Sequence, residues 1–280
     1  MTAHAEKLPL TPLLVTSASL ALFVMVVGAI TTSAAIWAGL NPARLPLAQS
    51  TVLAIAHQYA GSLLFLLLLA CTWAASKSSS GAIRWLILTA LAAGIGEIVT
   101  ISLGTLQDTS YIAVLHAICG HTILACLTAA AIIARTAASD DEPAVTISGS
   151  FPLATLANWI PPFVMTQVAM GALYRHDRWS VMPHMAGAML VAFLLVSEGV
   201  VLLQRVPEHR LLRRAALWSI TLVLCQISLG IADFLVRLLD FQDSVVWLVL
   251  SIAHVMVGAL TFTASLCLAF SVRVYARARN

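Results

Sequence analysis

Eight long apolar segments constrain the fold of this chain more than any other feature. Each holds about 20 or more residues, enough for a helix to cross a hydrocarbon core of about 30 Å. Backbone groups in lipid must satisfy their hydrogen bonds internally, so each segment should be α-helical. The segments cover residues 12–36, 51–75, 83–104, 111–135, 153–173, 182–204, 214–236 and 245–270. The sequence therefore predicts an all-α, polytopic membrane protein with eight transmembrane helices.

Composition supports this prediction. The 280 residues are 60% hydrophobic and only 10% charged, and the mean hydropathy is +0.95. A soluble domain of this length could not bury so much apolar surface. The net charge of +3 comes from residues between the apolar segments, so it concerns topology and does not indicate nucleic-acid binding. The first apolar segment has no small-residue cleavage site after it, so we expect a retained helix.

The cysteines do not indicate a disulfide framework or a zinc site. All of them fall inside apolar segments, and none forms a CxxC pair. Buried cysteines in such segments act mostly as small hydrophobic side chains. They are Cys71, Cys119, Cys126, Cys225 and Cys267.

Basic residues predict the orientation in the membrane, because Lys and Arg are enriched in cytoplasmic loops. Of the 15 basic residues, 11 fall on the side that holds both termini, and the other 4 fall on the opposite side. Both termini are therefore expected in the cytoplasm. The opposite, outer side holds Arg44, Arg175, Arg178 and Arg237.

Two similar halves are the expected domain organisation. Residues 1–138 and 153–280 would each form a four-helix bundle, joined by a polar cytoplasmic linker at 139–152. Gly28-Ala29 corresponds to Gly171-Ala172, and Ser102-Leu103-Gly104 corresponds to Ser228-Leu229-Gly230. Four helices separate corresponding segments, so the repeat is parallel, with a pseudo-two-fold axis along the membrane normal.

Four histidines lie near the outer end of alternate apolar segments. They are His57, His116, His184 and His254, and each has a glycine three or four residues later. A polar side chain inside a membrane span is costly and is a functional hypothesis by default. Two per half at matched depth predict two pairs that hold a flat cofactor in the bundle cores, with haem as the first candidate. The glycines Gly61, Gly120, Gly187 and Gly258 would let the macrocycle approach the backbone.

Other polar residues are secondary candidates. Arg175 is a candidate donor to a haem propionate, although an arginine that only extends to the interface is an equal alternative. Glu97 is expected to face the N-terminal cavity, and Glu198 to meet Arg205 or solvent. The remaining candidates have structural or indirect roles: Gln167, Gln226, His121 and His176.

The order of local strings resembles the haem A synthase family of cytochrome oxidase assembly proteins. VVGAITTS is similar to the end of that family's first helix, and QVAMGALYRH at 167–176 to the end of its fifth. HMAGAMLV and AHVMVGALTF are similar to the histidine regions of the sixth and eighth helices. The resemblance covers nearly the whole chain.

The resemblance implies a function for each half. His184 and His254 would hold the iron of a haem b cofactor, and His57 and His116 the iron of haem O as substrate. The reaction would oxidise a methyl group of haem O to a formyl group, which gives haem A for terminal oxidases. Implied partners are the lipid bilayer, haem O synthase, a terminal oxidase and an electron donor or acceptor. The expected location is a bacterial or archaeal plasma membrane.

The chain departs from the family beside its first histidine. Members often have an acidic residue three positions before it and an arginine after it, where this chain has Ala54 and Gln58. Glu97 is the candidate catalytic residue in place of the missing acid. Two alternatives remain open, a non-enzymatic dihaem b-type cytochrome that relays electrons and a haem-handling oxidase assembly factor.

Overall fold

Long helices account for almost all of the described chain. The computed structural model describes residues 10–39, 51–78, 80–104, 109–136, 145–147 and 153–278. The first four helices are α1 (Leu10–Gly39), α3 (Thr51–Ser78), α4 (Gly81–Gly104) and α5 (Thr109–Thr136). The next four are α6 (Leu153–Arg175), α7 (Val181–Arg205), α8 (Arg210–Leu238) and α9 (Val245–Tyr275). The expected all-α class is thus confirmed, apart from one small strand pair.

Seven of these helices are long and apolar enough to cross a membrane, and α6 is not among them. Asn158, Pro161, Pro162 and Gln167 lower the hydropathy of α6 relative to the other helices. The chain is therefore a multi-pass membrane protein by length and composition. The eighth span, expected at 153–173, stays a prediction.

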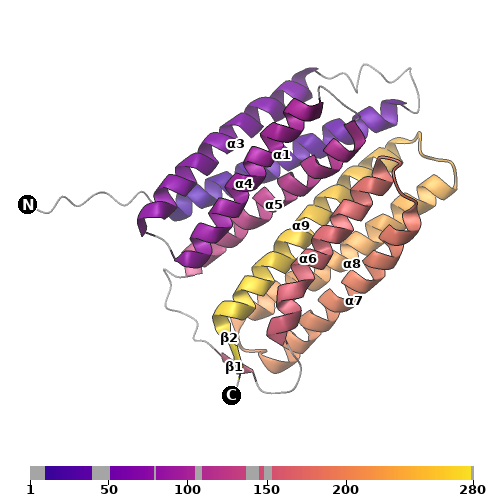
Figure 1. Cartoon of the computed structure of the whole chain (residues 1–280). Helices are drawn as coiled ribbons and strands as arrows, with labels where there is room; N and C mark the ends of the chain where they lie inside the picture. Colours follow the sequence, from indigo (N-terminus) through magenta and orange to yellow (C-terminus); the bar gives the residue numbers. More distant parts are fainter. Residues whose placement is uncertain are drawn as a thin grey trace, which may run out of the picture.

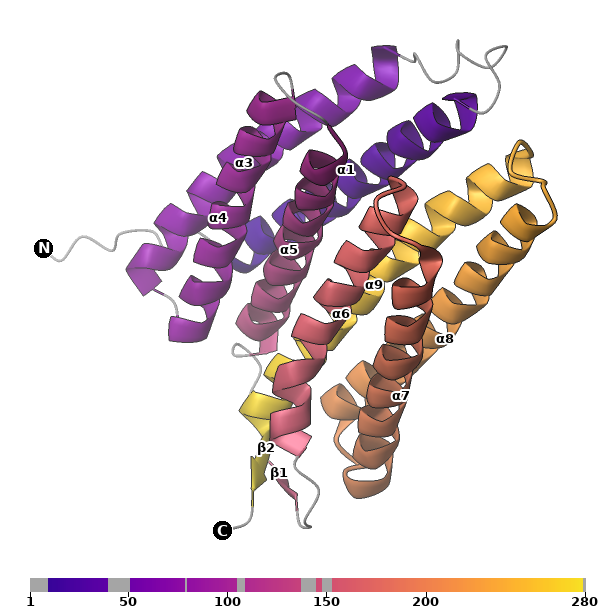
Figure 2. The same cartoon turned by 45° about the vertical axis from the view of Figure 1, so that its right-hand side comes forward.

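The helices pack in two groups of four (Figures 1 and 2). In the first group α1 contacts α3, α3 contacts α4, α4 contacts α5, and α5 returns to α1. In the second group α6, α7, α8 and α9 close a ring of contacts in the same way. Helices α3 and α5 are thus diagonal partners in one group, and α7 and α9 in the other. Between the groups, α5 contacts α9 and α6, and α1 contacts α9.

The short strands β1 (Val145–Ile147) and β2 (Ala276–Ala278) pair in parallel, with Val145 opposite Ala276. The pair joins part of the predicted 139–152 linker to the chain that follows α9 (Figure 1). The rest of that linker lies outside the described residues, as do Lys7, Arg44 and Arg279 of the orientation argument.

Large buried apolar side chains begin about two turns beyond the histidines. The first buried apolar side chain after His57 on α3 is Leu64, and after His116 on α5 it is Ile123. On α7 the first one after His184 is Val191. Each lies seven residues on, or about 10 Å along a helix. Most of the large buried apolar side chains therefore lie at the end of each group that is remote from the histidines, while Trp37, Val114 and Trp247 are buried at the histidine end.

Candidate functional site

The four histidines form two pairs. His57 on α3 and His116 on α5 have ring centroids 5.9 Å apart, with the ring planes at 65°. His184 on α7 and His254 on α9 have centroids 6.2 Å apart, with the planes at 78°. Each pair joins diagonal helices, so the rings meet inside their own four-helix group. The sequence predicted both pairings correctly as contacts between side chains.

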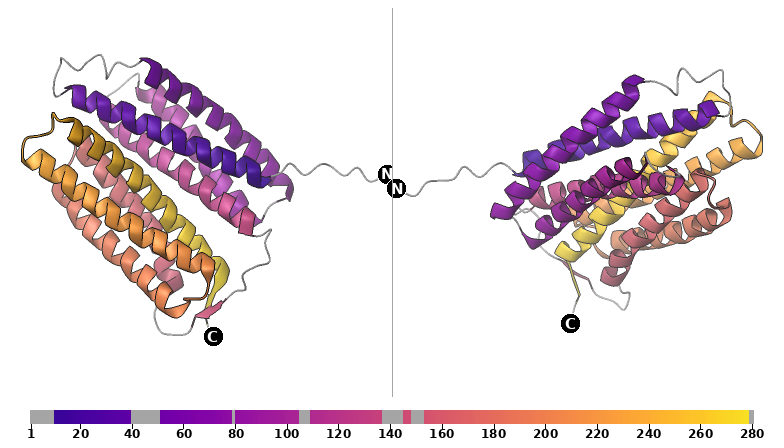
Figure 3. Two further views of the ribbon diagram at one scale, coloured as in Figure 1. Left: turned by 180° about the vertical axis from the view of Figure 1, so that it is seen from behind. Right: turned by 45° about the horizontal axis from the view of Figure 1, so that its top comes forward.

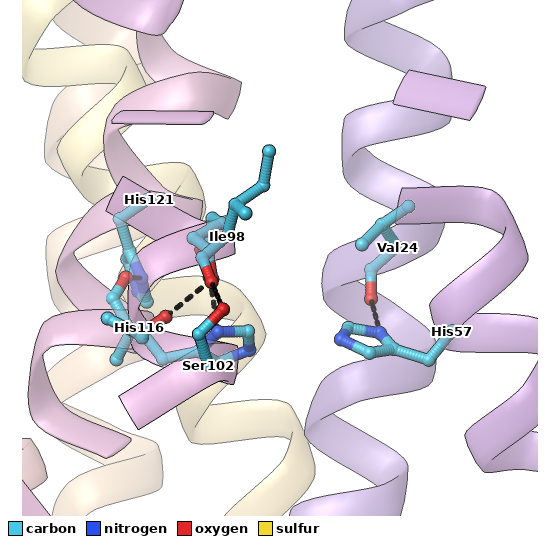
Figure 4. Close-up of polar contacts among 9 residues, drawn as sticks. Val24, His57, Ile98, Ser102, His116 and His121 are labelled. Carbon is cyan, nitrogen blue, oxygen red and sulfur yellow. Dashed lines mark hydrogen bonds and ion pairs between the residues drawn. The ribbon is translucent and has the colours of Figure 1, made fainter. Parts of the chain in front are cut away.

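The protein holds the Nδ1 atom of three of these rings. His57 Nδ1 donates to the carbonyl oxygen of Val24 on α1, at 3.1 Å (Figure 4). His116 Nδ1 forms an ion pair with the Glu97 carboxylate on α4. His184 Nδ1 accepts a hydrogen bond from Gln167 Nε2 on α6 at 2.9 Å. In His57 and His116, Nδ1 faces an oxygen and Nε2 is left for a ligand, which is the usual arrangement when a second residue orients a metal-binding imidazole. In His184 the amide of Gln167 must turn its oxygen to Nδ1 before Nε2 can bind a metal.

His254 differs from the other three histidines. Its Nε2 atom lies 3.2 Å from Gln226 Nε2 on α8, and its Nδ1 has no hydrogen-bond partner in the described chain. Iron ligation through Nε2 would require Gln226 to release that nitrogen. Sequence reasoning placed Gln167 and Gln226 near a bound group or another helix but could not assign either to a histidine.

Glycines on neighbouring helices lie directly against three of the rings. A Cβ atom added at Gly28 would come within 2.8 Å of His57 Cε1, and one at Gly171 within 2.8 Å of His184 Cε1. A Cβ atom at Gly230 would lie 3.0 Å from His254 Cε1. A methyl group at position 28 or 171 would therefore force a shift, and one at position 230 would need the imidazole to give by a few tenths of an ångström. The sequence marked these three glycines as parts of the repeat but missed their contact with histidine.

The glycines that follow each histidine in sequence have different neighbours. Gly61 has no atom within 4 Å of an added Cβ, and Gly120 faces Met25 and Glu97. Gly187 and Gly258 face Gln167 and Gln226. At none of these four glycines is an imidazole atom among the atoms nearest to an added Cβ.

Arg175 lies where the two helix groups meet. Its guanidinium donates to Ser33 on α1 at 2.6 Å and to Ser251 on α9 at 3.2 Å. Its Nε atom is buried and has no hydrogen-bond partner in the described chain. Arg237 and Asp233 lie close enough to interact with it electrostatically, and these two form an ion pair at 3.2 Å. Two cations and one carboxylate leave an excess positive charge, which suits an anionic group.

The other polar candidates are separate from the histidine pairs. His121 is buried and bonds to the Ala117 carbonyl of its own helix at 2.6 Å. His176 is half-buried in the turn after α6, where burial and the charge of Arg175 lower its pKa. Glu198 is 1% exposed, and its Oε1 has no hydrogen-bond partner in the described chain. The expectation that Glu198 meets solvent is wrong, because α7 turns it into the packed face beside Leu195 and Leu202.

Ala54, at the position where haem A synthases often have an acidic residue, lies on an exposed part of α3. Ala54 and Gln58 are both exposed, whereas Glu97 is 17% exposed and touches His116. His116 also lines a cavity of about 190 Å³ between α4 and α5, together with Thr100 and Ile112. Glu97 is thus the acidic side chain that contacts the N-terminal pair.

A pair of imidazoles can hold haem iron, because the porphyrin supplies the other ligands. Within the described residues, no group of three or more His, Cys, Asp or Glu side chains is placed to hold a metal ion by itself. Comparison with known proteins finds no family model that matches this chain, and no curated protein matches it significantly.

Proposed function

We propose that this protein is a membrane haem protein of the haem A synthase type, with one haem between the histidines of each helix group. The observation that carries the proposal is the pairing of histidines across diagonal helices in both groups. In each group the first helix also supplies a glycine against the first histidine, Gly28 for His57 and Gly171 for His184. This correspondence supports an internal repeat with a pseudo-two-fold axis.

The spacing of the rings fits two axial ligands of one iron atom. A metal–imidazole bond is about 2.0–2.1 Å, and the ring centroid lies about 1.1 Å beyond the nitrogen, so two imidazoles that held one iron would have centroids about 6.2–6.4 Å apart. The observed separations are 5.9 and 6.2 Å. Both rings of a pair can stand perpendicular to a macrocycle at the observed 65° and 78° to each other.

The distribution of the apolar core also favours a bound macrocycle. On α3, α5 and α7, the large buried side chains that follow the histidines begin at Leu64, Ile123 and Val191, although Trp37 and Trp247 are buried at the histidine end. A packed helix bundle normally has a continuous core. A flat apolar group between the histidines would complete that core at the outer end.

The two pairs would have different tasks. His184 and His254 would bind haem b, and His57 and His116 would bind haem O as the substrate. Its methyl group would become formyl by taking an oxygen atom from water and giving four electrons to an external acceptor. Haem iron supplies the redox chemistry when it is bound. The protein would orient the rings through Val24, Glu97 and Gln167. The buried guanidinium of Arg175 would meet a propionate.

Pigment analysis tests the proposed activity. The protein would be expressed with a haem O synthase, and the non-covalent haems would be extracted and separated. Formylated haem is the expected product. Persistent haem O together with an intact haem b signal would contradict the enzyme proposal while leaving haem binding in place. His184→Ala and His254→Ala should each remove the haem b spectrum, and survival of that spectrum in both variants would refute the ligand assignment.

A non-enzymatic dihaem cytochrome is the second candidate function. It is favoured by the ion pair that holds Glu97 against His116 and by the alanine at position 54, since neither leaves an acid free to manage protons. Glu97→Gln separates the two functions. In the synthase, this variant should retain haem in the N-terminal pair and lose formyl production. In a cytochrome, neither form makes formyl haem, and the variant shifts only the midpoint potential. A haem-handling assembly factor would bind haem without either redox property.

A further inference from the structure

A groove between the two helix groups has the features of a lipid-binding site. Its volume is about 340 Å³, and it is lined by α1, α5 and α9, which contact one another where the groups meet (Figure 3). Volumes of about 300 Å³ and above are typical of small-molecule pockets. This groove lies away from the histidines, because it begins at Leu22 on α1 and Leu124 on α5 and extends toward the opposite end.

The walls of the groove are mostly apolar, and several of the side chains that line it are exposed. Val15, Leu22 and Ile132 line it and are exposed, and each belongs to a helix able to cross a membrane. Along α5 the lining extends from Leu124 to Arg135, which is about 16 Å at the rise of an α-helix. This length and polarity suit an extended acyl chain.

A single cation stands at the end of the groove. Arg135 is in the last turn of α5 and is exposed. No hydrogen bond or ion pair joins its side chain to another residue in the described part of the chain. The α1 wall belongs to the first turns of that helix, so this end of the groove is the side that carries most of the basic residues. Basic pockets between helices on the cytoplasmic side bind anionic lipid headgroups.

We infer that this groove binds one anionic phospholipid of the cytoplasmic leaflet. The acyl chain would lie against α1, α5 and α9, and the headgroup phosphate would meet Arg135. The lipid would then bridge the two helix groups, since α1 and α5 belong to the first and α9 to the second. This inference does not depend on haem binding.

Photo-crosslinking tests the inference on the full chain. The protein would be placed in phosphatidylcholine nanodiscs with a small fraction of phosphatidylglycerol that carries a diazirine on its acyl chain. Matched nanodiscs would contain diazirine-labelled phosphatidylcholine instead. Crosslinks on the segments 15–22 and 124–135 should be about fivefold more frequent with the anionic lipid, the preference expected from one arginine at the surface.

Three variants complete the experiment. Arg135→Gln should remove the preference, whereas Arg84→Gln, an exposed arginine outside the groove on the same side, should retain it. Ser19→Trp adds bulk at an exposed position that lines the groove and should abolish crosslinking there for both lipids. Equal crosslinking of the two lipids, a preference that survives Arg135→Gln, or the same loss in Arg84→Gln would each overturn the inference.

Discussion

At the scale of single residues, the contact between glycine and imidazole leaves the least room for substitution. At Gly28 an added methyl group would lie 2.8 Å from His57 Cε1. Something must move to accept it, and the ring is the side chain in the way. We therefore expect position 28 to control the place of the His57 ring.

Gly28→Ala should displace His57 and lower haem occupancy of the N-terminal pair, at a cost of about 1–3 kcal/mol for overpacking. Haem per protein and thermal unfolding measure the two effects. Gly39→Ala is the matched control, because Gly39 is on the same helix as Gly28 and has no atom within 4 Å of an added Cβ. Equal occupancy in both variants would show that the contact does not position the ring.

Replacing Gln226 and replacing Gln167 should change the haem affinity in opposite directions, although both residues are glutamines. Gln226 engages Nε2 of His254, so Gln226→Leu should free that nitrogen and raise haem affinity a few-fold, the value of about one hydrogen bond. Gln167 contacts Nδ1 of His184, and its amide oxygen can accept the Nδ1 proton once the amide turns and Nε2 binds iron, so Gln167→Leu should lower affinity by about tenfold or more. Haem titration of the apoprotein measures both. A loss of affinity in Gln226→Leu would mean that Gln226 supports the ring.

At the scale of elements, α6 has the most distinctive role. Its end supplies Arg175, which reaches Ser33 on α1 and Ser251 on α9. In the turn that follows, Arg178 donates to Ser110 at the start of α5, at 3.0 Å. A further bond links the groups at the same end, from Trp37 Nε1 to the Asp243 carbonyl at 2.9 Å. Hydrogen bonds thus link the two groups at the end that holds the histidines, and apolar packing joins them elsewhere.

Helix α6 should cross the membrane although its own hydropathy is low. It packs between α7 and α9, so its prolines and polar side chains need not all meet lipid. Exposed Trp159 lies near the start of α6, and exposed Trp179 lies just after its end. Tryptophans are expected at the two membrane interfaces.

Cysteine labelling measures the path of α6. Ala154→Cys and Ser180→Cys, both at exposed positions, would be treated with a membrane-impermeant maleimide before and after cell lysis. We expect Ser180→Cys to react in intact cells and Ala154→Cys only after lysis. Labelling of both positions from one side would contradict a membrane-spanning α6.

At the scale of the whole molecule, the two ends differ in character. The histidine pairs, their glycines and the Arg175 cluster occupy one end, while most of the large buried apolar residues and most basic residues occupy the other. If the basic side is cytoplasmic, the haem sites face the outer side and the lipid groove faces the cytoplasmic leaflet.

Reporter fusions check this orientation. Green fluorescent protein joined after Asn280 should fluoresce, and alkaline phosphatase at the same position should be inactive. A phosphatase fusion after Trp179 should be active and serves as the control. The reverse pattern would invert the molecule and place the histidine pairs on the cytoplasmic side.

The sequence alone determined the helical, membrane-spanning class and which residues pair. Apolar length dictates helices in lipid. Alternate helices travel in the same direction, so His57 and His116 necessarily share one depth, as do His184 and His254. These inferences need only chain length, hydropathy and direction.

Tertiary structure alone decided how each helix is rotated and what each ring touches. Helices that are apolar on all sides carry no stripe that marks their inner face, so the sequence could not show that Glu97 meets His116 or that Gly28 supports His57. The same reason hid the burial of Glu198 and the two serine partners of Arg175. Rotation and contact follow from side-chain packing between helices that are distant in sequence, and only the assembled bundle fixes that packing.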